Sequence, residues 1–242
     1  MRHFFIVGAQ RSSTTWLYHM LQQHPQIKMA EPVRPEPKYF LQRDKSISAA
    51  DYKDQYFRDL LPVVTILGEK STSYIESEFA AQKISETFKD AKIVMMLRDP
   101  SHRALSNFRF SVENGLEIRS PEEVFLQKLP APKLTGDFST DPFDYLGRGQ
   151  YEKYLGLYSK YFDQKNIHVL CKEKVTTKPE VLRELYAFLS VDESFVPDAF
   201  DTSRNSSEIG FEASADVYAF LSEFYAQTKV SLSAFIDTAH WN

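Results

Sequence analysis

The sequence predicts a single α/β domain in which a central parallel β-sheet is flanked by helices on both faces. Short apolar runs rich in β-branched residues alternate with amphipathic helical patterns, and this alternation is typical of parallel sheets. The 242 residues suffice for one sizeable core and are too few for two ordinary domains, so we expect one domain over residues 1–242. No repeat or linker divides the pattern.

Four segments have the composition of buried strands. The first, at 3–8, is apolar and aromatic and ends at a glycine. The others are rich in Val, Ile, Leu and Met, and they lie at 63–68, 92–97 and 167–171. Strands without polar alternation are covered on both faces, which again predicts a parallel sheet.

Six helices are expected between and after these strands. Apolar residues recur at helical spacing in 14–22, 80–88, 103–112, 151–162, 181–189 and 217–225. The polar, proline-containing stretch from Pro121 to Pro142 is the least regular part, and we predict a mobile loop there.

Composition excludes several classes of function. With 29 Lys and Arg against 33 Asp and Glu, the net charge of −4 argues against a nucleic-acid partner, so an anion must be bound by a few local groups. Cys171 is the only cysteine, which excludes an internal disulfide. No stretch approaches the ~20 apolar residues of a membrane span, and we expect a cytoplasmic protein. The oligomeric state is not readable from the sequence.

A loop of small hydroxylated residues joins the first strand to the first helix. Small residues let backbone N–H groups and the helix N-terminus surround a phosphate. In the nucleotide triphosphatase pattern G-x-x-x-x-G-K-[ST], Gly8 and Thr15 match, whereas Ser13 and Thr14 replace the second glycine and the lysine. The loop predicts anion binding without ATP hydrolysis; the alternative is an ordinary strand–helix turn capped by Ser and Thr.

A second candidate anion site follows the strand at 92–97. Arg98, Asp99 and Pro100 come directly after it, and Ser106 lies two turns into the next helix. Ligands of parallel sheets bind at the carboxyl ends of the strands, where an arginine can make a bidentate contact with a phosphate. Alternatively, Arg98 pairs with Asp99 or a helix end, and Ser106 is merely exposed.

Together these motifs resemble those of PAPS-dependent sulfotransferases, where PAPS is 3′-phosphoadenosine 5′-phosphosulfate. R-S-S-T-T-W (11–16) is similar to the family's 5′-phosphosulfate loop, and L-R-D-P-x-x-R-A-x-S-x-F (97–108) to its 3′-phosphate loop. The resemblance is closest to the heparan sulfate sulfotransferase type. Five further segments are similar to motifs of that type and occur in the same order along the chain: His24-Pro-x-Ile27, Glu36-Pro-Lys-Tyr-Phe40, Gly68-Glu-Lys-Ser-Thr-Ser-Tyr74, Arg148-Gly-x-Tyr151 and Phe188-Leu189. It implies the P-loop-like sulfotransferase fold over 1–242, PAPS as donor, PAP (3′-phosphoadenosine 5′-phosphate) as product, and no metal.

The resemblance also implies a role for each donor-site residue. Arg11 would contact the bridging oxygen, where negative charge develops as the S–O bond breaks. Arg98 and Ser106 would bind the 3′-phosphate. Trp16 would stack on adenine, with packing in the core as the alternative. The phosphosulfate would be surrounded by Ser12, Ser13, Thr14 and Thr15.

Glu36 is the candidate general base. A hydroxyl acceptor loses its proton as it attacks sulfur, and a carboxylate within hydrogen-bond reach can take that proton. By resemblance Lys70 would lie near the sulfuryl group; by position alone it is a solvated lysine at a strand end. Glu31 is the rival base, and surface charge is the alternative for both glutamates. His24 and His102 match no catalytic position of the family, and we expect His102 to face solvent.

Three positions depart from the family's pattern. Ser13 stands where the family commonly has glycine, and Lys172-Glu173 stands where many relatives have Tyr-Glu, so an adenine contact by that tyrosine is lost or replaced. Arg204-Asn-Ser-Ser207 is the only candidate for the family's C-terminal phosphate loop.

We therefore predict sulfuryl transfer from PAPS to a hydroxyl, with an amine as second choice, of a carbohydrate or small-molecule acceptor. The acidic net charge and the few cations of 121–142, Lys128 and Lys133, argue against a long polyanionic acceptor.

Two other functions are weighed against this one. A small-molecule P-loop kinase is disfavoured because the loop lacks Gly-Lys and because no strand ends in an aspartate for Mg²⁺. A catalytically inactive nucleotide-binding protein would keep Arg98 and Ser106 but would need neither Glu36 nor Lys70.

Overall fold

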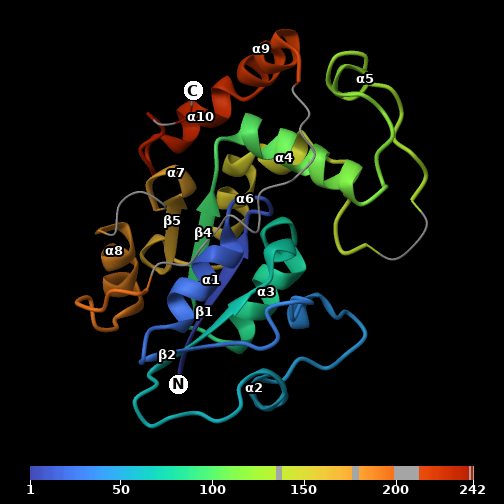
Figure 1. Cartoon of the computed structure of the whole chain (residues 1–242). Helices are drawn as coiled ribbons and strands as arrows, with labels where there is room; N and C mark the ends of the chain where they lie inside the picture. The colour runs from blue at the N-terminus through green and yellow to red at the C-terminus, as the bar shows by residue number, and fades with distance from the viewer. Residues whose placement is uncertain (135–137, 176–179, 199–212, 240, 242) are drawn as a thin grey trace.

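The structure is a computed structural model that describes residues 1–134, 138–175, 180–198, 213–239 and 241. Five strands form one parallel sheet in the order β2-β3-β1-β4-β5 (Figure 1). The strands are β1 (Arg2–Gly8), β2 (Ile27–Met29), β3 (Ile66–Lys70), β4 (Lys92–Leu97) and β5 (Ile167–Cys171). All five point their carboxyl ends toward the same edge of the sheet.

The helices are, in chain order, α1 (Thr14–Gln22), α2 (Ala49–Tyr56), α3 (Glu78–Thr87), α4 (Pro100–Glu113), α5 (Pro121–Phe125), α6 (Tyr151–Tyr158), α7 (Lys172–Val175), α8 (Glu180–Leu189), α9 (Ala215–Phe224) and α10 (Ala226–Leu232). Short 3₁₀ turns lie at η1 (Tyr39–Leu41), η2 (Thr72–Glu76), η3 (Gly147–Gly149) and η4 (Gln164–Asn166). No helix among the described residues is long and apolar enough to cross a membrane.

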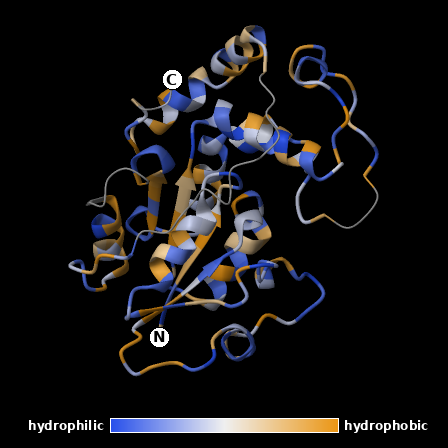
Figure 2. Ribbon diagram, in the orientation of Figure 1, coloured by the Kyte–Doolittle hydropathy of each residue, from blue (hydrophilic) through white to orange (hydrophobic). Residues whose placement is uncertain are grey.

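Helices cover both faces of the sheet, which confirms the predicted fold class. One apolar cluster joins the strands to α1 and α8, and another joins them to α2, α3 and α6. Because successive side chains of a strand point to opposite faces, Phe4 and Ile6 enter the first cluster and Phe5 and Val7 the second. Figure 2 shows the strands as a largely hydrophobic band between helices of mixed polarity.

Several elements differ from the sequence prediction. The strand expected at 63–68 is β3, which begins only at Ile66 and continues through Lys70. The sequence predicts neither β2, because three residues are too few to show a period, nor α2, whose buried residues are only Tyr52 and Tyr56. The helix expected over 151–162 ends as α6 at Tyr158.

The stretch from Pro121 to Pro142, predicted to be an irregular loop, begins with a helix. In α5 the Ser120 hydroxyl accepts a hydrogen bond from the Glu123 N–H while the Glu123 carboxylate accepts one from the Ser120 N–H. This capping box is a known start signal for helices, and it is strong enough to define even a helix of five residues.

The strand order decides which loops meet. Because β1 lies between β3 and β4, Ile6 pairs with Lys70 and Gly8 pairs with Met95. The loop after β1 therefore lies between the end of β3 and Arg98, which follows β4. In Figure 1 the strands point toward α4 and α10, which lie beyond this edge.

Candidate functional site

The loop after β1 has an irregular backbone. The Ala9 N–H donates to a carbonyl of β4 (2.8 Å), and Arg11 and Ser13 have positive φ angles of 69° and 60°. Gly8 packs so closely on Ile75 that an added Cβ would lie 2.8 Å from the isoleucine Cβ. Ser13 is the N-cap of α1, although its side chain makes no capping hydrogen bond. The family commonly has glycine at this position, and glycine would adopt the left-handed backbone of Ser13 without strain.

We expect the substitution Ser13→Gly to stabilise the protein. A left-handed backbone costs a residue other than glycine about 1–2 kcal/mol, and the greater entropy of glycine in the unfolded chain offsets about 0.4–1 kcal/mol of this. The net gain, about 0.8 kcal/mol at the middle of these ranges, should raise Tm by about 2–3 °C in a thermal melt. Ser77→Gly is the matched control, because Ser77 caps α3 at φ −107° and accepts a hydrogen bond from Ala80 N–H (3.1 Å). A Ser13→Gly protein that melts below wild type would contradict this account.

Glu36 is held by the end of β3 and the turn after it. Its Oε1 accepts from Lys70 Nζ (2.5 Å), its Oε2 accepts from the Thr72 N–H (2.9 Å), and the Thr72 hydroxyl lies 3.0 Å from both oxygens. The Lys70 side chain is 3% exposed and that of Glu36 is 15% exposed. Lys70 is therefore not the solvated lysine that its position alone suggests. Thr72 was not singled out from the sequence, although it lies in the motif that ends at Tyr74.

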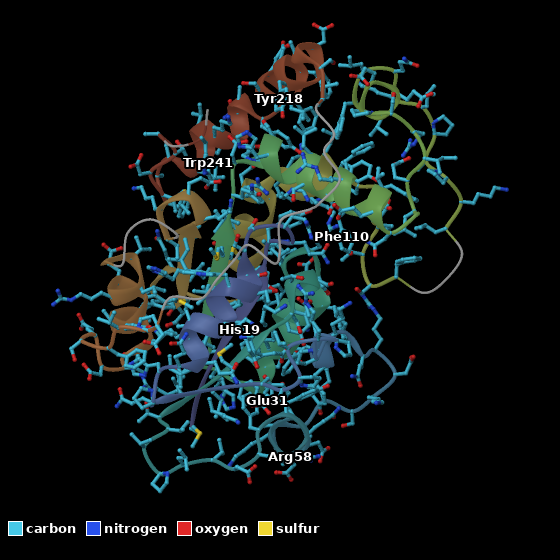
Figure 3. All side chains as sticks on the ribbon, viewed as in Figure 1. His19, Glu31, Arg58, Phe110, Tyr218 and Trp241 are labelled. Atoms are coloured by element: carbon cyan, nitrogen blue, oxygen red, sulfur yellow. The ribbon has the colours of Figure 1, made fainter. Side chains whose placement is uncertain are left out.

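The rival base, Glu31, lies on the surface. Its carboxylate pairs with Lys28 at 3.0 Å, and its side chain is 55% exposed (Figure 3). It has the surroundings of an ordinary surface charge, whereas Glu36 has a largely buried ammonium partner. The geometry thus favours Glu36 over Glu31.

Arg11 extends toward α4. Its Nε donates to Ser106 Oγ (3.2 Å), and its guanidinium carbon lies 4.8 Å from the centre of the Phe110 ring, which is partly exposed on α4 (Figure 3). Nη1 of Arg98 is 3.5 Å from the Arg11 carbonyl, and Nε of Arg98 is buried without a hydrogen-bond partner among the described residues. The fold thus brings together Arg11, Arg98 and Ser106, as the two motifs predicted.

These cations are crowded and poorly solvated. Burial lowers the pKa of Arg11, and the charges of Arg98, Arg34 and Arg109 lower it further, while Glu113 opposes them. Burial is also the main cause that lowers the pKa of Arg98; Glu173, Tyr151 and Asp99 oppose it, and Arg109 adds a smaller lowering effect. Positive groups that repel one another in a site with little water are stabilised by an anion. The electrostatics therefore favour a phosphate or sulfate ligand.

Residues that the sequence analysis missed hold the Arg98 loop. The Tyr151 hydroxyl donates to the Arg98 carbonyl (3.0 Å). Asp99 caps α4 by accepting from the His102 N–H (3.0 Å), and it pairs with Lys229 of α10 at 2.9 Å. The Arg148-Gly-x-Tyr151 motif was the available signal for the tyrosine contact; no local pattern links Lys229 to Asp99.

The remaining predicted residues have varied surroundings. Ser12 and Thr14 are buried, and Thr15 is half-buried. Trp16 is partly buried beside the apolar cluster of α1 and α8. Burial lowers the pKa of Lys172, and the charge of Arg98 adds to this effect. The candidate loop Arg204–Ser207 lies outside the described residues.

Neither histidine is placed for catalysis. His24 is buried, where its Nδ1 accepts from the Gln26 N–H (3.1 Å) and its Nε2 lies 3.0 Å from the Asp192 carbonyl. His102 is 47% exposed, as expected. In the part of the chain that the structure describes, no three His, Cys, Asp or Glu side chains are grouped to hold a metal ion.

A cleft of about 790 Å³ is lined by residues that adjoin Glu36 and Thr72 in the chain. Pro37 and Lys38 follow Glu36, and Ser73 follows Thr72. Further lining comes from Phe79 at the start of α3 and from the segment 138–140. Lys38 Nζ donates to Ser139 Oγ (2.8 Å), which lies 3.1 Å from Ser73 Oγ. The cleft therefore offers hydroxyls, aromatic rings and an ammonium group to a small molecule.

A family model described as "Sulfotransferase family" matches residues 3–194. Membrane-associated sulfotransferase kil1 of Dictyostelium discoideum is 31% identical over 121 residues, which cover 49% of this chain and 25% of that protein. Heparan sulfate glucosamine 3-O-sulfotransferase 3B1 of Mus musculus is 27% identical over 187 residues, 77% of this chain and 45% of that protein. The chain thus spans less than half the length of these relatives.

Two solved structures have the same fold. A sulfotransferase from Alicyclobacillus acidocaldarius matches with a TM-score of 0.76 at 26% identity, covering 100% of this chain and 98% of that one. The sulfotransferase domain from the curacin biosynthetic pathway matches with a TM-score of 0.53 at 14% identity over 97% of both chains, which supports the fold alone. The residues matched by the family model, 3–194, include the loop after β1, Glu36, Lys70 and Arg98.

Proposed function

Because the chain belongs to the sulfotransferase family, we propose that it transfers the sulfuryl group of PAPS to a hydroxyl of a carbohydrate or small-molecule acceptor. Transfer would be in line and metal-independent, with Glu36 as general base. The observation that carries the proposal is the pair of Glu36 and Lys70, largely buried at the carboxyl end of β3. Between β3 and β4 in the sheet, β1 leads into the loop that contains Arg11.

The proposed reaction is a single displacement at sulfur. The acceptor oxygen forms a bond to sulfur, the bond from sulfur to the bridging oxygen breaks, and that oxygen keeps the electron pair in PAP. Glu36 accepts the hydroxyl proton of the acceptor. Once Glu36 is protonated it no longer neutralises Lys70, so the ammonium can stabilise the charge on the departing oxygens. The ion pair of the free protein thus supplies both the base and the electrostatic partner.

The proposed donor site uses the cations that follow β1 and β4. Arg98 and Ser106 would bind the 3′-phosphate, and Ser12, Ser13, Thr14 and Thr15 the phosphosulfate, with Trp16 on the adenine. Arg11 donates to Ser106 in the free protein, so a contact with the bridging oxygen requires its side chain to leave Ser106 when the donor binds. These protein cations would supply the charge that magnesium supplies in phosphoryl transfer.

We propose the cleft beside Glu36 as the acceptor site. Its volume of about 790 Å³ suits a small molecule or a few sugar units, so the acceptor need not be a long polyanion. Phe138 and Phe79 offer aromatic surface, although the Arg43 guanidinium lies 4.6 Å from the centre of the Phe79 ring, and Ser73 and Ser139 offer hydroxyls that can bind a polar acceptor. An acceptor screen with labelled PAPS should start from hydroxylated compounds of this size.

A kinase would need an acidic residue at a strand end to hold Mg²⁺, and the one at the end of β4 is already bound. Asp99 is the acidic residue there, and it already caps α4 and pairs with Lys229. A magnesium ion would have to displace both partners. The inactive-protein alternative does not explain why Glu36 and Lys70 are brought together in a largely buried pair.

A titration separates these functions. We expect calorimetry to show tight binding of PAP without magnesium and far weaker binding of Mg-ATP, because the loop after β1 lacks the lysine that contacts the terminal phosphates of ATP. AMP is the matched control, since it lacks the 3′-phosphate that Arg98 and Ser106 would bind. Preference for Mg-ATP over PAP would overturn the sulfotransferase proposal.

A further inference from the structure

Glu69 is a buried carboxyl group that the proposed reaction does not use. It precedes Lys70 in β3, and because successive side chains of a strand alternate, it points to the opposite face of the sheet. Its residue is 0% exposed. A carboxyl group is costly to bury unless hydrogen bonds compensate for the lost water, so this position calls for a physical reason.

Tyrosines surround this carboxyl group. Tyr52 and Tyr56 of α2, Tyr74 of η2 and Tyr158 of α6 all interact electrostatically with Glu69. Burial raises the pKa of Glu69 to about 7, and the negative charge of Glu36 acts in the same direction. The hydroxyls of Ser71, Tyr74 and Tyr52 oppose this rise because they stabilise the ionised form. Near neutral pH the group is therefore close to its midpoint.

Two of these hydroxyls hold the backbone that follows Glu36. The Ser71 hydroxyl donates to Glu69 Oε1 (2.6 Å) and accepts from the Lys38 N–H (2.9 Å). The Tyr74 hydroxyl accepts from the Phe40 N–H (3.0 Å). A hydroxyl that accepts from a backbone N–H must direct its own hydrogen elsewhere, and ionised Glu69 is an acceptor for it. The carboxylate accepts from Ser71 and thus sets the direction of the Ser71 hydrogen bonds.

We propose that Glu69 is a positioning residue that holds the segment Glu36–Phe40, and with it the candidate base, through the Ser71 hydroxyl. The inference rests on the proposed function, because it assigns Glu69 an effect on the base. Glu36 itself accepts hydrogen bonds from Lys70 and Thr72, on either side of Ser71 in the chain. Hydrogen bonds therefore join the two motifs at Glu36, at Lys38 and at Phe40.

Kinetics provide the first test. Ser71→Ala leaves the Lys38 N–H without its acceptor, and we expect kcat to fall about tenfold while the Kd for PAP stays within about twofold of wild type. Glu69→Gln should also lower kcat at pH 8, and it should remove an inflection near pH 7 from the kcat profile. Loss of PAP affinity in proportion to kcat, or wild-type kcat in both variants, would overturn the proposal.

Stability distinguishes positioning from support of the fold. Since the pKa of Glu69 is raised in the folded state, its contribution to stability declines as the pH rises from about 4 to 7. At pH 8 wild type therefore carries a buried charge that Glu69→Gln lacks, and the variant should unfold at no lower temperature than wild type. A lower kcat without a lower Tm would indicate positioning; a lower Tm at pH 8 would contradict it.

Hydrogen exchange supplies a readout that needs no activity. Ser71→Ala and Glu69→Gln should speed amide exchange in 36–42 and leave the loop at 8–16 unchanged. Glu117→Gln is the control, because Glu117 is also a buried carboxylate and binds Arg119 (2.7 Å) and Tyr145 (2.9 Å) away from this segment; it should alter neither kcat nor exchange at 36–42. If wild type fails to use PAPS, the proposed function fails, whereas unchanged exchange at 36–42 in both variants overturns this inference.

Discussion

Replacing Glu36 by glutamine should lower kcat about 10²–10⁴-fold, because the variant cannot accept the proton of the acceptor hydroxyl. The amide keeps one oxygen, which can accept from Lys70 Nζ or from the Thr72 N–H but not from both, so the variant retains one of these two contacts. The donor is bound by residues after β1 and β4, and we therefore expect an unchanged Kd for PAP. The measurements are steady-state turnover with saturating PAPS and calorimetric titration with PAP.

Glu31→Gln is the matched control for this experiment. Glu31 is a surface carboxylate paired with Lys28, and its replacement should leave kcat at the wild-type value. The reverse outcome, a slow Glu31→Gln and an unimpaired Glu36→Gln, would transfer the role of base to Glu31. Equal turnover in all three proteins would mean that neither carboxylate is the base.

Arg98→Ala should weaken PAP binding by about 10²–10³-fold, because a buried arginine with a charge-assisted contact to a phosphate is worth several kcal/mol, about 2–5 by comparison with other buried pairs. The free protein should lose less stability than PAP affinity, because Arg98 is poorly solvated and its Nε has no hydrogen-bond partner among the described residues, although the charges of Glu173 and Asp99 attract it. Titration with PAP and a thermal melt of the free protein measure the two effects.

Arg98→Lys separates charge from shape. It keeps one positive charge but loses the planar fork, so its PAP affinity should fall between those of wild type and Arg98→Ala. AMP, which has no 3′-phosphate, should bind all three proteins alike. A variant that lost PAP and AMP binding equally would place Arg98 away from the 3′-phosphate.

The sequence predicted the fold class and most of the sheet, because buried parallel strands have a composition that few other structures share. The regions around β1, β4 and β5 were assigned from their apolar runs alone. β2 and α2 were missed because their burial depends on neighbours distant in the chain. The end of β3 was also missed. Glu69 and Lys70 are charged residues, which are unusual in a fully buried strand, and only their tertiary partners allow them to be buried there.

The candidate site was predictable to a similar extent. Arg11, Arg98, Ser106, Glu36 and Lys70 were all named from motifs, and the structure brings them to the carboxyl ends of β1, β3 and β4 or beside them. Some partners that orient them were not, because an ion pair such as that of Lys229 with Asp99 joins residues that are far apart in the chain. Short-range sequence patterns do not indicate which distant residues come into contact in the folded chain.

By itself, the sequence determined that this chain is an α/β protein, and it located the two motifs for which anion binding is predicted, since those features depend on residue type and short-range spacing. Tertiary structure alone decided that Arg11 turns to Ser106, that Asp99 pairs with Lys229, and that Glu36 meets Lys70 out of water. Each of these contacts depends on the order of strands in the sheet, which places the ends of β3, β1 and β4 side by side. That order follows from packing over the whole domain, and only the folded chain specifies it.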